Sequence, residues 1–452
     1  MAQPIHELVV AGRLALPGGR LTAGELGISD GRIVTIGTPG RLEGTERFDA
    51  GELIVLPGQV DTHVHTRSEP AEGIAAATAA AAAGGVTTIV DMPYDASGPV
   101  DSRAALERKI ADVERDAIVD VALWATIAKT GGLGEIPGLV EAGACAFKVS
   151  LFETHPFRFP RIDDGELLLA MGRIRDAGSL IAFHAESDDI VTRLTRALAE
   201  AGRTDPLVHA EARPPVAETE AIGRVLELGL ATGARVHIVH VSVERGFTLI
   251  ERGRSDGVDV TAETCTHYLV LDEEDLHRLG SRAKINPPLR PRREVEALWR
   301  LLSAGAVDWV TSDHVGWAAD QKGGDISTAK SGGPSVELTW SLLHDEAVVR
   351  RGLPLGRLVE VLCERPARRF GLWPRKGALA VGADADLVVF DPAARFTVDE
   401  AALVSNAGWS AYHGRELVGR VERVLVRGRA VFADGAVVGR PGQGTFVRPG
   451  PA

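Results

Sequence analysis

The chain has 452 residues, 45% of them hydrophobic, which is enough for a large core or for more than one domain. Its formal net charge of −12 disfavours a nucleic-acid backbone or an anionic membrane as a partner. Three widely spaced cysteines argue against a disulfide framework, and the absence of a CxxC pair argues against a thiolate zinc site. We expect a cytoplasmic protein, because the first residues also lack the pattern of a signal peptide.

The first predicted elements are β-strands. Residues 5–57 contain short strands separated by turns, as in LGISDGRIVTIG. Glycine-containing turns between alternating strands are typical of hairpins. We therefore assign residues 1–57 to a β domain that the other end of the chain completes.

Residues 58–375 alternate apolar β-type runs with helical patterns. The eight runs lie at residues 59–65, 86–92, 119–125, 144–150, 180–186, 235–242, 258–264 and 307–313. The helical patterns include residues 74–85, 102–115, 164–178, 216–233 and 292–305. Strands that alternate with helices form parallel βαβ units, so eight of them predict an α/β fold, a (β/α)₈ barrel of the TIM type. An open doubly wound sheet is the alternative, but its usual glycine-rich phosphate turn is absent after the first strand.

The last segment, residues 376–452, returns to the hairpin pattern of the N-terminus, as in VERVLVRGRAVFADGAVVG. We expect residues 1–57 and 376–452 to form one small composite β-sandwich domain beside the barrel.

Polar side chains stand where five of the predicted strands end. The catalytic groups of such barrels lie at the carboxyl ends of the strands, so we expect these side chains to meet. They are His63 and His65 on strand one, Lys148 on strand four, His184 on strand five, His240 on strand six and Asp313 on strand eight. Two imidazoles at i and i+2 share one strand face, and with further imidazoles and a carboxylate they predict a divalent-metal site. His237 and His314 are expected to point away from it.

Lys148 is unexpected among metal ligands, because an ammonium group would repel the cations. Burial in ACAFKVS lowers the pKa of the amine, and a neutral amine can react with carbon dioxide to give an anionic carbamate that could bridge two metal ions. The alternative is a lysine that reaches past the site to a salt bridge.

This pattern resembles the amidohydrolase superfamily, and more closely its cyclic amidases: dihydroorotase, allantoinase, hydantoinase and dihydropyrimidinase. The similarity extends over nearly the whole chain and includes LPGQVDTHVH, GGVTTIVDMP, HIVHVS, KINPPLR and KGALAVGADADLVVFDP. The resemblance implies that Lys148 is carboxylated and bridges two metal ions, usually zinc. It also implies that His63, His65 and Asp313 hold the more buried ion, and His184 and His240 the more exposed one.

The resemblance leaves the ring that the enzyme opens unassigned. Arg67 matches the arginine with which dihydroorotases hold a carboxylate, but Tyr94 and Trp317 replace two other groups of that site. AETCTHYL resembles an allantoinase motif, with Thr266 in place of proline, and DGELL resembles the hydantoinases. We therefore place the chain in the hydantoinase and allantoinase group, with dihydroorotase activity as the alternative.

The expected reaction is hydrolysis of a small cyclic amide by a hydroxide that bridges the two metal ions. Asp313 would take the proton from the hydroxide and deliver it to the leaving ring nitrogen. Arg67 would bind a substrate oxygen, or else form a structural salt bridge; Asn286 and Ser331 are further candidates for substrate contacts. The loop LFETHPFRFP is bulky and apolar, which favours rings with an apolar or aromatic substituent.

Two other classes of function are compatible with such a barrel. Some dihydropyrimidinase-like proteins lose metal ligands and serve as non-catalytic assembly proteins, but all the ligand positions are filled here. A mononuclear deaminase would usually lack the lysine on strand four. Relatives of the cyclic amidases suggest a homodimer or a homotetramer.

Overall fold

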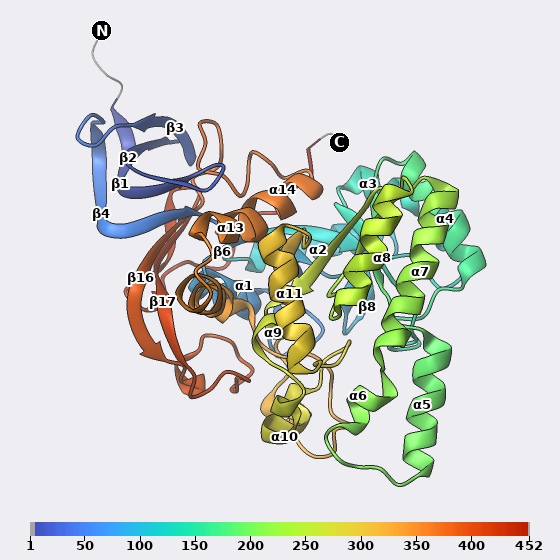
Figure 1. Cartoon of the computed structure of the whole chain (residues 1–452). Coiled ribbons are helices and arrows are strands. Elements are labelled where there is room, and N and C mark those ends of the chain that lie inside the picture. The colour runs from blue at the N-terminus through green and yellow to red at the C-terminus, as the bar shows by residue number, and fades with distance from the viewer. Residues whose placement is uncertain (1–4, 451–452) are drawn as a thin grey trace.

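The computed structural model describes residues 5–450, and its main feature is a closed barrel of parallel strands (Figure 1). The strand order is β14-β13-β12-β11-β10-β9-β6-β5-β15, and β14 and β15 are consecutive pieces of the last strand position. The barrel strands are β5 (Gln59–His65), β6 (Val86–Asp91), β9 (Asp120–Ala125), β10 (Ala146–Ser150), β11 (Leu180–His184), β12 (Arg235–Ile238), β13 (Val260–Cys265), β14 (Trp309–Thr311) and β15 (His314–Val315). All eight predicted strands are therefore present, and the predicted fold class is confirmed.

Helices follow the strands and cover the outside of the barrel, as Figure 1 shows for α4, α7 and α8. Side-chain caps begin two of the predicted helices: Ser102 accepts a hydrogen bond at the start of α2, and Asp163 does so at the start of α4. The helices are α1 (Gly73–Ala83), α2 (Arg103–Asp116), α3 (Ile136–Ala142), α4 (Asp164–Asp176), α5 (Asp188–Glu200), α6 (Val208–Ala212), α7 (Pro215–Thr232), α8 (Glu244–Ser255), α9 (Thr266–Val270), α10 (Glu274–Leu279), α11 (Arg292–Ala304), α12 (Thr339–Leu343), α13 (Leu355–Val359) and α14 (Arg365–Arg369). None of the helices within residues 5–450 combines the length and apolarity that a membrane crossing requires.

Both ends of the chain contribute to a second, mixed sheet with the order β19-β18-β17-β16-β4-β1-β2-β3. Its strands are β1 (His6–Leu16), β2 (Arg20–Ser29), β3 (Arg32–Gly37), β4 (Gly44–Pro57), β16 (Leu387–Thr397), β17 (Glu416–Val426), β18 (Arg429–Ala433) and β19 (Ala436–Val437). A short hairpin, β7 (Tyr94–Asp95) and β8 (Gly98–Pro99), stands apart. The segment that follows β19 returns to the barrel, where the N–H group of Val121 donates a hydrogen bond to Thr445 O at 2.9 Å. The domain bounds 1–57, 58–375 and 376–452 stay a prediction.

A cluster of buried charges joins the two sheets. The Nζ atom of Lys376 lies 2.5 Å from Asp120 of β9, 2.9 Å from Asp384 and 2.7 Å from Asp386, just before β16. The side chain of Lys376 is fully buried. Burial by itself would lower its pKa, but the facing carboxylates outweigh this and raise it. The three aspartates are close enough to hold a metal ion, but the ammonium group takes that place.

Four of the predicted strands end earlier than their apolar runs suggest, and two of these early ends shape the site. The run 235–242 forms a strand only to Ile238, and the run 307–313 is interrupted between β14 and β15. His240 and Asp313 lie just beyond these ends, with positive φ angles of 43° and 49°. A positive φ is uncommon for a residue with a side chain and is found most often where a tight turn or a functional site requires it. Both residues therefore leave the strand direction at the carboxyl end of the barrel.

Candidate metal centre and substrate pocket

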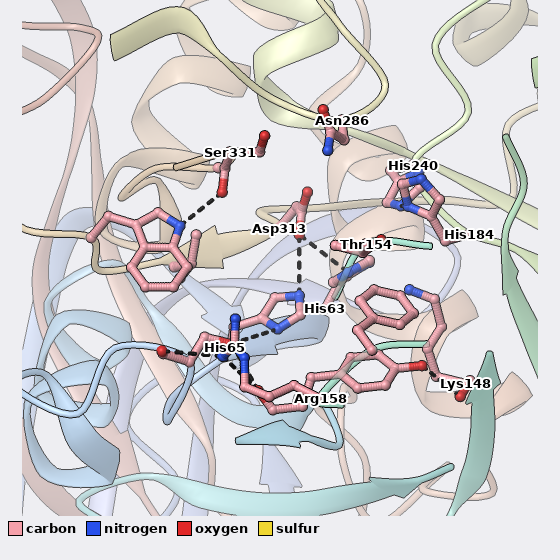
Figure 2. A pocket seen from close by; sticks show the side chains of 16 residues that line it. His63, His65, Lys148, Thr154, Arg158, His184, His240, Asn286, Asp313 and Ser331 are labelled. Atoms are coloured by element: carbon pink, nitrogen blue, oxygen red, sulfur yellow. Dashed lines mark hydrogen bonds and ion pairs between the residues drawn. The ribbon is translucent and has the colours of Figure 1, made fainter. Parts of the chain in front are cut away.

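One pocket at the carboxyl ends of the barrel strands brings together all the side chains predicted as metal ligands. It is open to solvent and has a cavity volume of about 110 Å³. Its lining includes His63, His65, Lys148, His184, His240 and Asp313 (Figure 2). These residues come from five strand positions of the barrel, so the fold itself creates the cluster from positions up to 250 residues apart (Asp313 and His63).

His63, His65 and Asp313 form the first group in the pocket. The Oδ1 atom of Asp313 lies 3.1 Å from Nε2 of His63 and 3.6 Å from Nε2 of His65. Ligand atoms of these three residues all lie within 4.8 Å of one another, which is close enough to hold one metal ion. Two imidazoles and a carboxylate are ligands that zinc and similar divalent ions accept.

His184 and His240 form a second group. Nδ1 of His184 lies 2.9 Å from Nε2 of His240, and both rings are buried. The Nε2 atom of His184 faces a carboxylate oxygen of Glu186 at 2.7 Å, which orients the ring. Burial is the main reason why the pKa values of both histidines lie below the ordinary value, so both imidazoles are neutral near pH 7 and able to bind a metal.

Glu263, in the middle of β13, supports the first group and was missed in the sequence. Its Oε1 atom lies 2.6 Å from Nδ1 of His63, while Oε2 accepts from Trp309 Nε1 at 2.9 Å. Burial alone would raise the pKa of Glu263, but hydrogen bonds from His237 and His63 and their charges hold it well below the ordinary value. The sequence does contain a signal for Glu263, because a carboxylate within an apolar strand run needs a polar partner. Such a partner fixes the ring orientation of a metal-binding histidine.

Histidines 237 and 314 do not line the pocket. His237 stacks on Trp309, with ring centroids 4.4 Å apart, and Nε2 of His314 lies 2.8 Å from Glu72. Each of these rings therefore has a structural contact away from the six clustered side chains.

Lys148 enters the pocket without a carboxylate beside it. Its side chain is buried, and among residues 5–450 no acidic group lies within ion-pair distance of its Nζ atom. Its Nζ atom lies over the ring of Phe159, 5.3 Å from the ring centroid. Burial lowers the pKa of Lys148 to about 8, although Asp313 and Glu263 partly oppose this shift. The amine is consequently neutral for an appreciable fraction of the time near neutral pH.

The candidate substrate contacts divide into two kinds. Asn286 and Ser331 line the pocket, and Oδ1 of Asn286 is buried without a hydrogen-bond partner within the described chain. Arg67 does not line it: its guanidinium is paired with Asp112 of α2 and lies 3.7 Å from Asp95. This is the salt bridge that was the alternative for Arg67 in the sequence. A different arginine, Arg158, lines the pocket instead.

The three phenylalanines of the apolar loop predicted to shape substrate choice lie in different places. Phe159 lines the pocket, and Phe152 lies over the guanidinium of Arg213 at 4.4 Å in a neighbouring cavity. Phe157 is 63% exposed and contributes to neither.

A (β/α)₈ barrel with imidazoles, a buried lysine and an aspartate at its strand ends is the arrangement of a metal-binding barrel enzyme. A family model described as the amidohydrolase family matches residues 54–431, so the chain belongs to that family.

Known proteins resemble the chain over almost its full length. The allantoinase of Rubrobacter xylanophilus is 42% identical over 98% of this chain and 98% of that protein. The D-hydantoinase of Ralstonia pickettii is 34% identical over 95% of each. Among solved structures, an L-hydantoinase (dihydropyrimidinase) from Arthrobacter aurescens matches with a TM-score of 0.94 and 32% identity, covering 98% of this chain and 100% of that chain. These similarities confirm the resemblance to the cyclic amidases.

Proposed function

We propose that the protein hydrolyses a C–N bond in the ring of a cyclic amide or ureide, with an activity of the allantoinase or hydantoinase kind. The observation that carries this proposal is the meeting of four imidazoles, Asp313 and an unpaired, buried lysine in one pocket. The relatives that bear the names allantoinase and D-hydantoinase support the choice of substrate class.

The donor set fits two divalent metal ions, and imidazole and carboxylate ligands suit zinc. His63, His65 and Asp313 would hold one ion, and His184 and His240 the other. Lys148, as a carbamate formed from its neutral amine and carbon dioxide with loss of a proton, would supply the shared anionic ligand. When bound, the two ions supply an ionised water near neutral pH and polarise the carbonyl under attack.

Asp313 is the proposed proton carrier. Burial raises the pKa of its carboxyl group, while the charges of His63 and Lys148 oppose the shift. A carboxylate with a raised pKa can take the proton from the attacking water and then donate it to the ring nitrogen as the C–N bond breaks. One residue can serve both steps because they occur in sequence.

Asn286 and Ser331 are the proposed contacts to the ring. The Oδ1 atom of Asn286 is a buried acceptor without a partner within the described chain, which is energetically costly. It can accept a hydrogen bond from an N–H group of the substrate ring. The carbonyl of Ser331 already accepts from Trp317 Nε1 at 2.7 Å, which fixes the loop beside the ring.

A ring-opening assay on allantoin, hydantoin, dihydrouracil and dihydroorotate tests the proposed function. We expect the zinc-loaded enzyme to turn over allantoin or hydantoin fastest. A preference for dihydroorotate would overturn the choice of subfamily. A protein that stays free of metal in metal-supplemented medium and opens none of the rings would point to a non-catalytic relative. The proposed homodimer or homotetramer can be checked by light scattering.

Recovery of the metal-free enzyme should depend on pH through Lys148. Because the pKa of this amine is about 8, its neutral fraction rises roughly 25-fold between about pH 6.5 and pH 8.5. The initial rate of reactivation by Zn²⁺ should rise by a similar factor when dissolved carbon dioxide is held constant. ¹³C NMR with labelled bicarbonate should show a carbamate signal in the reactivated protein. A reactivation rate that depends on neither pH nor carbon dioxide would contradict the proposal that Lys148 forms a carbamate.

A further inference from the structure

The loop after β10 forms a small hairpin that carries Arg158. His155 and Phe159 pair across it, each N–H donating to the other's carbonyl at 3.0 Å. At its tip, Nδ1 of His155 accepts from the backbone N–H groups of Phe157 and Arg158 at 3.2 and 3.1 Å. The hairpin therefore has internal hydrogen bonds that define the position of the Arg158 backbone.

The hairpin docks on Tyr94 at the pocket wall. The ring of Phe159 stacks on that of Tyr94, with centroids 3.6 Å apart, and the Tyr94 hydroxyl donates to Lys148 O at 2.8 Å. The guanidinium of Arg158 then lies on the side of His65, as Figure 2 shows. Among the described residues it donates only to the carbonyls of Ser68 and Tyr94, at 3.4 Å each. These hydrogen bonds are long, so much of the donor capacity of the guanidinium is unused.

Arg158 also has no ion-pair partner, although the charge of Asp95 acts on it from farther away. Within residues 5–450 no carboxylate lies within ion-pair distance of it, whereas Arg213 is paired with Glu186, and Arg203 with Asp205 and Glu211. These are the other arginines that border the pocket or the cavity next to it. Arg158 is partly buried, and this burial lowers its pKa, while the charge of Asp95 opposes the shift. An incompletely hydrated guanidinium without an anion is a ready partner for an oxygen acceptor.

A neighbouring cavity gives room for a group attached to the ring. Its cavity volume is about 390 Å³. Arg158 lines both spaces, together with Thr154, Asn286, Trp317 and Ser331. A substituent on a ring held in the first pocket would pass Arg158 on its way into the second. The amine of Lys284, which also borders the second cavity, already donates to Ser327 O and Ala329 O.

We propose that Arg158 determines specificity, by binding a ring substituent that presents an oxygen acceptor. This inference rests on the proposed function of the same pocket. A carboxylate matches the two parallel N–H groups of a guanidinium, and a ureido carbonyl matches one of them. Rings with an apolar substituent gain nothing at this position and leave the guanidinium desolvated. The substrate class is therefore a cyclic amide or ureide with a carboxylate or ureido substituent.

The test compares wild-type holoenzyme with Arg158→Gln on hydantoin-5-acetate, allantoin, unsubstituted hydantoin and 5-benzylhydantoin. We expect kcat/KM to fall roughly 10- to 100-fold for the first two rings and less than about 3-fold for the others, mainly through KM. Arg158→Lys should recover part of the activity on hydantoin-5-acetate, because it keeps the charge, but little on allantoin. For the carboxylate ring, KM should also rise with salt.

Arg161→Gln is the matched control. This arginine belongs to the same loop but is paired with Asp188 and lines neither cavity. Its replacement should therefore leave the ratios of kcat/KM between the four rings unchanged. A wild-type preference for 5-benzylhydantoin, or an equal loss on all rings in Arg158→Gln, would overturn the role of Arg158 while leaving the proposed function intact. If the metal-loaded wild type opens none of the rings, both proposals fail.

Discussion

Lys148→Ala should lower kcat/KM for ring opening by at least about 10³-fold, or about 4 kcal/mol, and should reduce the bound metal. The physical reason is the charge balance of the pocket. Without the carbamate, the first proposed ion keeps one carboxylate, Asp313, and the second keeps only the neutral imidazoles of His184 and His240. Metal content by elemental analysis and activity on the preferred ring check this result together.

Two further variants separate a carbamate from a lysine that only fills space. Lys148→Glu returns a carboxylate to the site and should bind more metal than Lys148→Ala. Small carboxylic acids such as propionate should partly restore Lys148→Ala by entering the space that the side chain leaves. Lys129→Ala is the surface control, because Lys129 is 53% exposed and lies outside the pocket. Full activity of Lys148→Ala would instead favour a mononuclear enzyme.

The sequence predicted the barrel because its strands are short apolar runs that alternate with helices. The metal ligands could be predicted for the same reason, since each stands at the end of a run and the fold brings those ends together. The strand breaks could not be predicted. His240 and Asp313 adopt positive φ angles, and no propensity of His or Asp alone requires them.

The two arginines show where pattern reasoning stops. Arg67 follows the two histidines at the spacing of one strand face, but β5 ends at His65 and Arg67 lies in the turn beyond it. Its partner there, Asp112, lies on α2 and could not be foreseen from the spacing. Arg158 lies in a loop whose apolar residues dominated the interpretation, and its place depends on the docking of Phe159 on Tyr94. Both outcomes are set by tertiary contacts between segments that no local period connects.

The ammonium group of Lys376 should be the most important single charge for the stability of the two-sheet arrangement. We expect Lys376→Met to lower the free energy of unfolding by about 3–5 kcal/mol, because it leaves buried carboxylates without their cation. Asp120 keeps its ion pair with Arg427 and Asp384 keeps its ion pair with Arg375, so the unpaired charge falls mainly on Asp386. Denaturant unfolding followed by circular dichroism measures the change.

Arg375→Gln is the matched control for Lys376→Met. Arg375 is the adjacent cation and lies 3.0 Å from Asp384, but its side chain is 44% exposed. Exposed ion pairs contribute little, so this variant should lose less than about 1 kcal/mol. A loss of similar size in both variants would mean that the cluster acts through general surface charge rather than through the buried ammonium group.

The loss caused by Lys376→Met should also depend on pH. In the wild type the pKa of Asp386 is already raised by burial, with Lys376 opposing the shift. Without Lys376 this pKa rises further above its unfolded value, so the folded variant binds a proton that the unfolded chain releases. A carboxyl group with a raised folded pKa lowers the free energy of unfolding of the protein as pH rises from its unfolded to its folded pKa value. The difference in unfolding free energy between wild type and Lys376→Met should therefore be smaller near about pH 5 than near about pH 8. A difference that is constant over this range would show that the variant is destabilised by packing and not by the unpaired carboxylate of Asp386.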